Sequence, residues 1–324
     1  MHAQLAPAAA ALRCAAPLAE VPALRLAELG APGDALAALV RAARTITLLS
    51  GAGISTASGV PDYRSPGRPA YAPLQHVDFM TKAATRRRYW ARSTLGWARM
   101  AGARPNAGHV AVAALQRAGL LRRVITQNVD RLHTAAGAVD VLELHGSIHD
   151  VACEACRGWA ISRHDLQGAL LRGNAGWLAQ WAPAAAPRPD GDVELPADAY
   201  NGFAAPTCPL CRSDLVKPQV TFHGGNVPAP VAEASLAAAR GSDLLLVVGS
   251  TLSTWSACRL AKATAGAGGR VAIVNHGATR ADELASVRVD AHTSSVLGAL
   301  ARERLPPPGG GGDAAAAGPP PPPR

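Results

Sequence analysis

The sequence has few aromatic residues and no long apolar run. Only 4% of its 324 residues are Phe, Trp or Tyr, whereas 48% are hydrophobic, so a core must be built mainly from aliphatic side chains. No run of about 18 apolar, uncharged residues occurs, which argues against a membrane-spanning helix. The hydrophobic share is too high for a wholly disordered chain. The length predicts one large globular domain or two smaller ones.

Lysine is almost absent. Only Lys82, Lys217 and Lys262 occur, so the formal charge of +9 comes mainly from arginine. The densest basic run is residues 86–88, and the other arginines are scattered. Nucleic-acid-binding proteins usually gather their basic residues on one face or along one helix. We therefore expect no specific nucleic-acid partner.

Cysteine is scarce, but four of the six cysteines form two Cys-x-x-Cys pairs. The pairs are Cys153 with Cys156, and Cys208 with Cys211. In a chain of this length, such pairs are typical of a metal site rather than of a disulfide framework, and they favour a reducing compartment. A redox dithiol is the alternative, but it does not explain the second pair.

Both ends of the chain lack the residues that build a core. Residues 1–34 are rich in Ala and Pro and lack the basic and apolar regions of a secretory signal. Residues 306–324 are Pro, Gly and Ala apart from one Asp and the final Arg. We expect residues 1–34 to be poorly ordered and residues 305–324 to form a disordered tail.

Five short apolar runs each end at a polar or Gly-rich cluster. Nearly continuous apolar runs are typical of parallel strands that are covered on both faces. Helical stretches lie between several of them, including one that begins after Asn106 and ends near Gly119. The pattern predicts an α/β fold with an open parallel sheet. The runs are residues 45–49, 124–126, 141–144, 244–248 and 271–274, and the clusters begin at Ser50, Gln127, His145, Gly249 and Asn275.

In such a sheet, ligands bind beyond the carboxyl ends of the strands, so the five clusters could line one crevice. In the first cluster, Gly51 and Gly53 allow close backbone approach, and backbone N–H groups can hold a diphosphate. The spacing differs from G-x-G-x-x-G, and no acidic residue closes a second strand to hold an adenine ribose. An ordinary dehydrogenase is therefore disfavoured.

These motifs resemble, in their order, those of the sirtuins, which are NAD-dependent protein deacylases. They are Gly51–Ser65, Gln127–Asp130, His145-Gly146 and the two Cys-x-x-Cys pairs. Residues 73–100 further resemble the class II branch. The resemblance implies a Rossmann-like NAD-binding domain, discontinuous over residues 35–150 and 217–304, into which a zinc-binding module at 151–216 is inserted.

The resemblance also implies the NAD contacts, which all lie at or near the strand-terminal clusters. Asn128 and Asp130 are implied as catalytic residues too. The implied contacts are Gly51, Ala52, Gly53 and Ser55 around the diphosphate, Asp62, Tyr63 and Arg64 on a cofactor loop, Gln127, Asn128 and Asp130 at the nicotinamide ribose, and Gly249, Ser250, Thr251, Asn275, His276, Gly277 and Thr293 toward the adenosine half.

His145 is the predicted general base. In the sirtuin reaction the acyl-lysine carbonyl oxygen attacks the ribose C1′ and expels nicotinamide, and a base then deprotonates a ribose hydroxyl so that it attacks the imidate. A neutral imidazole suits this step near neutral pH, because its ordinary pKa is about 6.5. His145 ends an apolar run and is followed by Gly146, which leaves backbone room for a substrate.

The cysteines are implied to hold one structural Zn²⁺. A Cys₄ site has no open position for water or substrate, so this ion would not be catalytic. The 51 residues between the pairs exceed the linker of a compact zinc ribbon. They predict a folded insertion with its own small core.

Two segments depart from the usual family pattern. Residues 220–226 lack the common acidic residue, and residues 249–256 replace Gly-Ser-Ser-Leu-x-Val-x-Pro with Gly-Ser-Thr-Leu-Ser-Thr-Trp-Ser. In the family these segments flank the substrate peptide, so the departures bear on peptide selectivity. The predicted substrate contacts are Phe222, Gly224, Gly225, Trp255, and the pair Tyr89 and Arg92, which resembles the Tyr-x-x-Arg pair that reads acidic acyl groups in desuccinylases.

The predicted function is an NAD-dependent protein-lysine deacylase, which cleaves NAD to nicotinamide and transfers the acyl group to ADP-ribose. Its expected partners are acylated protein lysines, with no membrane partner, and its expected location is the bacterial cytoplasm rather than the mitochondrial matrix. An NAD-dependent protein ADP-ribosyltransferase is the alternative on the same scaffold. A nucleic-acid-binding zinc protein is a third interpretation, which salt-dependent DNA affinity without NAD consumption would support.

Overall fold

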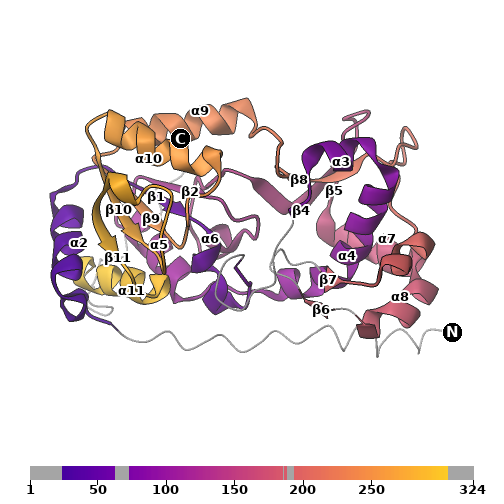
Figure 1. Cartoon of the computed structure of the whole chain (residues 1–324), viewed down its shortest axis with the longest axis horizontal. Helices are drawn as coiled ribbons and strands as arrows, with labels where there is room; N and C mark the ends of the chain where they lie inside the picture. Colours follow the sequence, from indigo (N-terminus) through magenta and orange to yellow (C-terminus); the bar gives the residue numbers. More distant parts are fainter. Residues whose placement is uncertain (1–23, 63–72, 185, 188–192, 306–324) are drawn as a thin grey trace, which may run out of the picture.

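The structure is a computed structural model that describes residues 24–62, 73–184, 186–187 and 193–305. The chain forms a larger lobe around a parallel sheet and a smaller lobe rich in helices (Figure 1). No helix in these described ranges is long and apolar enough to cross a membrane.

The larger lobe is built on a six-stranded parallel sheet of order β11-β10-β9-β1-β2-β3. The predicted α/β class is confirmed, and each of the five apolar runs contributes a strand. The chain moves outward from β1 in one direction and from β9 in the other, so the topological switch point lies between β1 and β9. The strands are β1 (Ile46–Ser50), β2 (Arg123–Thr126), β3 (Leu142–Glu143), β9 (Leu244–Val248), β10 (Arg270–Val274) and β11 (Ala285–Val289).

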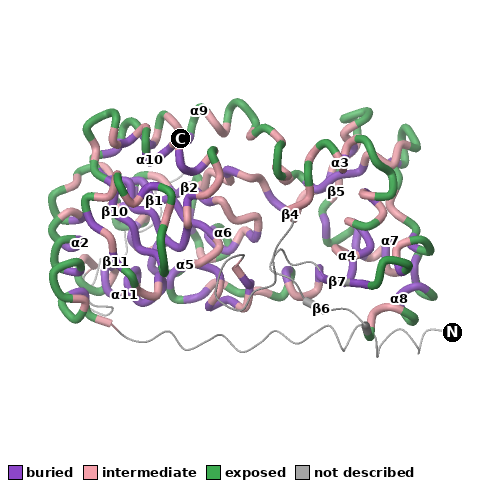
Figure 2. The backbone as a smooth tube through the Cα atoms, in the orientation of Figure 1, coloured by how far each residue is buried: buried purple, intermediate pink, exposed green. Residues whose placement is uncertain are grey.

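Helices cover both faces of this sheet, which explains why its central strands are apolar on both sides. On β9, Leu246 and Val248 pack with one helical layer, whereas Leu245 and Val247 pack with the other. Figure 2 shows these strands buried while the outer sides of α2 and α9 are exposed. The first layer is α2 (Ala31–Ala42), α5 (Ala107–Arg117) and α11 (Thr293–Arg304), and the second is α9 (Ala229–Arg240) and α10 (Trp255–Gly266).

The smaller lobe has its own core, as expected of a folded insertion. Trp90, Trp177 and Phe203 are buried there, together with Cys153 and Cys208. The sheet of this lobe has the order β5-β4-β8 with antiparallel pairs. Its elements are α3 (His76–Thr81), α4 (Ala83–Gly102), β4 (Gly146–Cys153), β5 (Ala160–Ser162), α7 (Arg163–Gly173), α8 (Ala175–Trp181), β6 (Ala186–Pro187), β7 (Val193–Glu194) and β8 (Val216–Val220).

Short helices complete the chain, and the predicted cap of α5 is confirmed. Asn106 Oδ1 accepts from the Gly108 N–H at 2.8 Å, and the helix ends two residues before Gly119. The short elements are η1 (Leu26–Leu29), η2 (Ala52–Ile54), η3 (Thr56–Ser58), α6 (Leu132–Ala135), η4 (Ala182–Ala184), η5 (Ala197–Gly202) and η6 (Asp282–Leu284).

Two expected boundaries differ from the structure. Residues 26–34 were expected outside the fold, but Leu26 is buried in the main core and α2 begins at Ala31. Helix α4 was expected in the NAD-binding domain, but its Trp90 and Leu95 pack in the core of the smaller lobe, because the apolar stripe of the helix faces that way. The expected disorder of residues 1–23 and 306–324 lies outside the described residues.

Candidate active site

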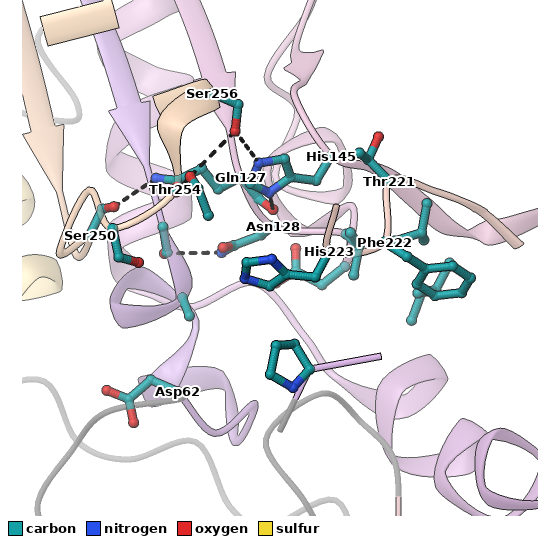
Figure 3. A pocket seen from close by; sticks show the side chains of 18 of the residues that line it. Asp62, Gln127, Asn128, His145, Thr221, Phe222, His223, Ser250, Thr254 and Ser256 are labelled. Carbon is teal, nitrogen blue, oxygen red and sulfur yellow. Dashed lines mark hydrogen bonds between the residues drawn. The ribbon is translucent and has the colours of Figure 1, made fainter. Parts of the chain in front are cut away.

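A cleft of about 1910 Å³ lies between the two lobes. The polar clusters after β1, β2, β3, β9 and β10 all line it, as the rule for open parallel sheets predicts. Every predicted NAD, catalytic and substrate residue that the structure describes lines this one cleft. Tyr63 and Arg64 lie outside the described residues, whereas Asp62 is described and lies at the cleft (Figure 3).

Glycines bring the loops after β1 and β9 into direct backbone contact at the switch point. A Cβ at Gly53 would lie 2.7 Å from the Gly249 Cα, and one at Gly51 would lie 2.7 Å from the Gly249 carbonyl oxygen. Gly249 itself has a φ of 59°, a conformation that favours glycine. The Gly53 N–H donates to the Gly249 carbonyl at 2.9 Å. The glycines therefore build a compact floor, beside which Ala52 lines the cleft.

A buried polar network lies under the loop after β2. The Ser55 hydroxyl donates to Asp130 Oδ2 at 2.7 Å, and Asn128 Nδ2 donates to Ser55 Oγ at 3.0 Å. The other Asp130 oxygen accepts from the Leu132 N–H at 3.0 Å. Burial raises the pKa of Asp130, whereas the hydrogen bonds from Ser55 and Leu132 lower it by a smaller amount. Asp130 therefore fixes the loop, while Asn128 faces the cleft.

His145 follows β3, and both of its ring nitrogens have partners (Figure 3). Nδ1 lies 3.1 Å from the Gln127 carbonyl oxygen, and Nε2 lies 2.9 Å from Ser256 Oγ. A carbonyl oxygen only accepts, so Nδ1 carries the proton and Nε2 carries the lone pair of the neutral ring. Burial lowers the pKa of His145, which favours that neutral form near pH 7.

Gly146 is required by the backbone beside His145. Its φ is 75°, and a Cβ there would lie 2.0 Å from the Gln219 carbonyl oxygen on β8. The Thr221 N–H donates to the His145 carbonyl at 2.8 Å. The close pairing of β4 with β8 therefore fixes the backbone on which His145 stands.

The clusters after β9 and β10, which the resemblance assigns to the adenosine half of NAD, line the cleft together with Thr293. Gln127 Nε2 donates to Ser250 Oγ at 2.7 Å, which joins the loops after β2 and β9. Asn275 Nδ2 donates to the His276 carbonyl at 2.7 Å and so closes its own turn. The Thr293 hydroxyl donates to the Gly53 carbonyl at 3.2 Å. Thr251 and Gly277 complete this lining.

The predicted acyl-reading pair lies where the smaller lobe meets the cleft. The Tyr89 ring packs edge-on against Phe222, with ring centroids 5.4 Å apart. Arg92 Nε donates to the Val193 carbonyl at 2.7 Å, which ties α4 to β7. Both residues line the cleft, so they do not form a merely solvated helix face. Trp255, which also lines the cleft, is 57% exposed.

The four paired cysteines converge in the smaller lobe. Their sulfur atoms all lie within 4.8 Å of one another, with Cys153 and Cys211 3.6 Å apart and Cys156 and Cys208 3.7 Å apart. A tetrahedral Zn²⁺ with bonds of about 2.3 Å to sulfur separates its ligands by about 3.8 Å. The donor set and spacing therefore fit one structural zinc ion, and none of the four cysteines lines the cleft.

Sequence reasoning gave no role to several residues that surround His145. Ser256 contacts its Nε2, Thr254 is next in the same hydrogen-bonded chain, and His223 lines the same cleft and lowers the pKa of His145. Ser256 and Thr254 stand where the family pattern has Pro and Val, and that departure was the available signal.

Comparison with known proteins relates most of the chain to one family. Residues 51–256 match the model of the Sir2 family. NAD-dependent protein deacetylase 3 of Pseudomonas syringae pv. tomato is 44% identical over 264 residues, which cover 81% of this chain and 92% of that protein. NAD-dependent protein deacylase Sirt4 of Drosophila melanogaster is 43% identical over 79% of this chain and 82% of its own length. The solved structure "Sir2-p53 peptide-NAD+" is 29% identical, with a TM-score of 0.64 over 83% of this chain and 96% of that chain.

Proposed function

The chain belongs to the Sir2 family and is an NAD-dependent protein deacylase, and we propose that it acts on acyl-lysine side chains with His145 as the general base. NAD is a substrate in this reaction, because its bond to nicotinamide is broken and its ribose receives the acyl group. The volume of the cleft, about 1910 Å³, leaves room for both NAD and a peptide segment.

The observation that carries this proposal is the hydrogen bonding of His145. The reaction needs a base for a ribose hydroxyl after nicotinamide departs. Nδ1 is committed to the Gln127 carbonyl, so Nε2 is the atom that can take the proton. Burial keeps the ring neutral to a pH below the ordinary histidine range, because it lowers the pKa. The base is therefore in its reactive form at neutral pH.

Asn128 and Asp130 support the reaction at the nicotinamide end. Asn128 Nδ2 donates to the Gly51 carbonyl as well as to Ser55, which holds the amide beside the predicted diphosphate floor. Asp130 acts through Ser55 and the backbone of Leu132. We assign Asn128 to contact with the nicotinamide ribose and Asp130 to positioning of that loop.

The protein substrate enters, in this proposal, between the loop after β8 and the loop after β9. Phe222, Gly224 and Gly225 line one side, and Trp255 lines the other. The His76 N–H donates to the His223 carbonyl at 2.8 Å, so the outer edge of the β8 loop is already paired. The inner edge is the one we assign to the substrate backbone.

The deacylase and the ADP-ribosyltransferase are distinguished by their products. We expect incubation with NAD and a panel of acyl-lysine peptides to give nicotinamide, free lysine and O-acyl-ADP-ribose, each measured by mass spectrometry. ADP-ribosylated protein without acyl loss would instead support the transferase. His145→Ala protein is the matched control, because it retains the cleft without the base.

We also propose that Tyr89 and Arg92 make carboxylated acyl groups better substrates than acetyl. A guanidinium can bind a carboxylate through two hydrogen bonds, and the phenol can add a third. Arg92→Met should lower kcat/KM for a glutaryl peptide about ten- to a hundredfold, because a charge-assisted hydrogen bond in a partly desolvated pocket is lost. Acetyl, lipoyl and glutaryl peptides are compared on both proteins.

The control for Arg92→Met is Arg87→Met, the same change on the same helix at a residue that does not line the cleft. It should leave the ranking of the three peptides unchanged. If acetyl is the best substrate of the wild type, or if Arg92→Met weakens all three peptides equally, the pair does not read the acyl group. The Arg92 contact with Val193 would then be its main role.

The state of the cysteines indicates in which cellular compartment the protein works. None of the cysteines in the described part of the chain forms a disulfide; they are Cys153, Cys156, Cys208, Cys211 and Cys258. A zinc-binding thiolate set persists in a reducing compartment. We therefore propose the bacterial cytoplasm as the location.

A further inference from the structure

A chain of hydrogen bonds runs from Nε2 of His145 to the side chain of Gln127, whose backbone carbonyl accepts from Nδ1 of the same ring (Figure 3). Its Nε2 is 2.9 Å from Ser256 Oγ, and Ser256 Oγ is 3.3 Å from Thr254 Oγ1. The Thr254 hydroxyl is 3.5 Å from Gln127 Oε1, and Gln127 Nε2 donates to Ser250 Oγ at 2.7 Å. The backbone carbonyl of the same Gln127 holds Nδ1.

The amide at the far end fixes the direction of this chain. Gln127 Nε2 donates to the Ser50 carbonyl at 3.3 Å, so the amide nitrogen must face that oxygen and Oε1 must face Thr254. An amide oxygen only accepts, so the single Thr254 proton is used on Gln127. Thr254 can then only accept from Ser256.

Ser256 has one hydroxyl proton but two neighbours that need it when His145 is neutral. It can donate to Nε2 or to Thr254, and one of the two contacts is left without a proton. When Nε2 is protonated, it donates to Ser256, Ser256 donates to Thr254, and Thr254 donates to Gln127. Protonation of His145 therefore completes a chain that is one hydrogen bond short in the neutral state.

We propose that Ser256 and Thr254 are positioning residues that stabilise the imidazolium of His145 and so strengthen it as a base. This inference rests on the proposed role of His145 for its catalytic meaning, but not for its geometry. For proton transfer the ribose hydroxyl takes the place of Ser256 at the single lone pair of Nε2; the ribose O–H bond breaks and Nε2–H forms, and this N–H then donates to Ser256 without a further proton transfer. The family pattern, with Val and Pro at these two positions, offers neither hydroxyl.

The surroundings of His145 make such support effective. Burial lowers its pKa most, the hydrogen bond to the Gln127 carbonyl raises it, and His223, from the loop after β8, lowers it. Arg259, one helical turn beyond Ser256 on α10, is a charged residue that also lines the cleft. The uncharged chain of hydroxyls therefore offsets part of the free-energy cost of protonating His145 in this buried position.

The test is an NMR titration of His145 in the full chain without substrate, with its resonance assigned by loss in His145→Gln. Ser256→Ala should lower the pKa of His145 by about half a unit to one unit, because a hydrogen bond to the charged form is lost. Thr254→Val keeps the shape of the side chain and does not touch His145, so it should lower the pKa by less. Ser256→Thr, which retains a hydroxyl, should restore most of the shift.

Ser253→Ala is the matched control, because Ser253 lies in the same loop and its hydroxyl is outside the chain. It should leave the pKa unchanged. An unchanged or raised pKa in Ser256→Ala would overturn the proposal, since a raised pKa means that Ser256 mainly serves the neutral ring. An unchanged pKa in Thr254→Val would also overturn it. These readouts require no turnover, so they stand apart from the deacylase assignment.

The same variants connect the chain to catalysis. If His145 is the base, Ser256→Ala should lower the rate at high pH and move the acidic limb of the kcat/KM profile to lower pH, in step with the titration. A shifted pKa of His145 with an unchanged pH profile of kcat/KM would support the hydrogen-bond chain but contradict the role of His145 as the general base.

Discussion

His145→Ala is expected to lower the rate of deacylation about 10²–10⁴-fold, because a positioned general base typically contributes that much. The substitution removes Nε2, which carries the lone pair of the ring because Nδ1 donates to the Gln127 carbonyl. NAD affinity should change little, because the predicted diphosphate and adenosine contacts lie on other loops. Deacylation is measured by peptide mass spectrometry, and NAD affinity by calorimetry.

The matched control is His164→Ala, which removes an exposed imidazole from α7 outside the cleft. It should retain full activity. A His145→Ala enzyme within about threefold of the wild-type rate would contradict the assignment, since that loss is far below what removal of a base causes. A large loss of NAD affinity would instead assign His145 to binding.

Much of the larger lobe could be predicted because its strands are buried on both faces. Strand β9 is fully buried along Leu244–Val248, so its sequence is a continuous apolar run. Strand β11 was not predicted. It is an edge strand in which only Val287 and Val289 are buried, so its apolar signal is half as dense. Alternating burial, rather than edge position alone, removed the signal, because β3 is also an edge strand but lies in the continuous apolar run 141–144.

The placement of α4 could not be read from its own sequence. Its buried stripe, which includes Trp90 and Leu95, indicates a covered face but not the partner that covers it. The structure shows that partner to be the core of the smaller lobe, formed mostly by residues more than fifty positions further along the chain. Amphipathic periodicity defines a face, whereas the choice of lobe depends on contacts between distant segments.

The cleft was predicted from strand ends, but the hydrogen-bond chain on His145 was not. Its members come from the loop after β2 and from the start of α10, so Gln127 and Ser256 are 129 positions apart in the sequence. The family resemblance flagged Thr254 and Ser256 only as departures. Their hydroxyls reach toward His145 because of the turn that begins α10, and the spacing of motifs in the sequence does not predict that turn.

Cys208→Ser is expected to release the zinc ion and destabilise the smaller lobe. Three thiolates and a hydroxyl bind Zn²⁺ poorly, and the binding energy of a structural zinc is folding energy, about 10–16 kcal/mol in small zinc domains. Cys153 and Cys208 are buried in the same core as Trp90 and Trp177, so loss of the ion acts directly on that core. Zinc content is measured by mass spectrometry of the metal, and unfolding by tryptophan fluorescence.

The matched control is Cys258→Ser, the same change at a thiol that is equally buried but lies on α10, away from the cluster. It places a hydroxyl in an apolar core and should cost about 1–3 kcal/mol of stability, yet it should retain a full equivalent of zinc. The two variants therefore separate loss of the metal from loss of a buried thiol. Less than about half an equivalent of zinc in active wild-type protein would contradict the assignment, since a structural ion must accompany the folded chain.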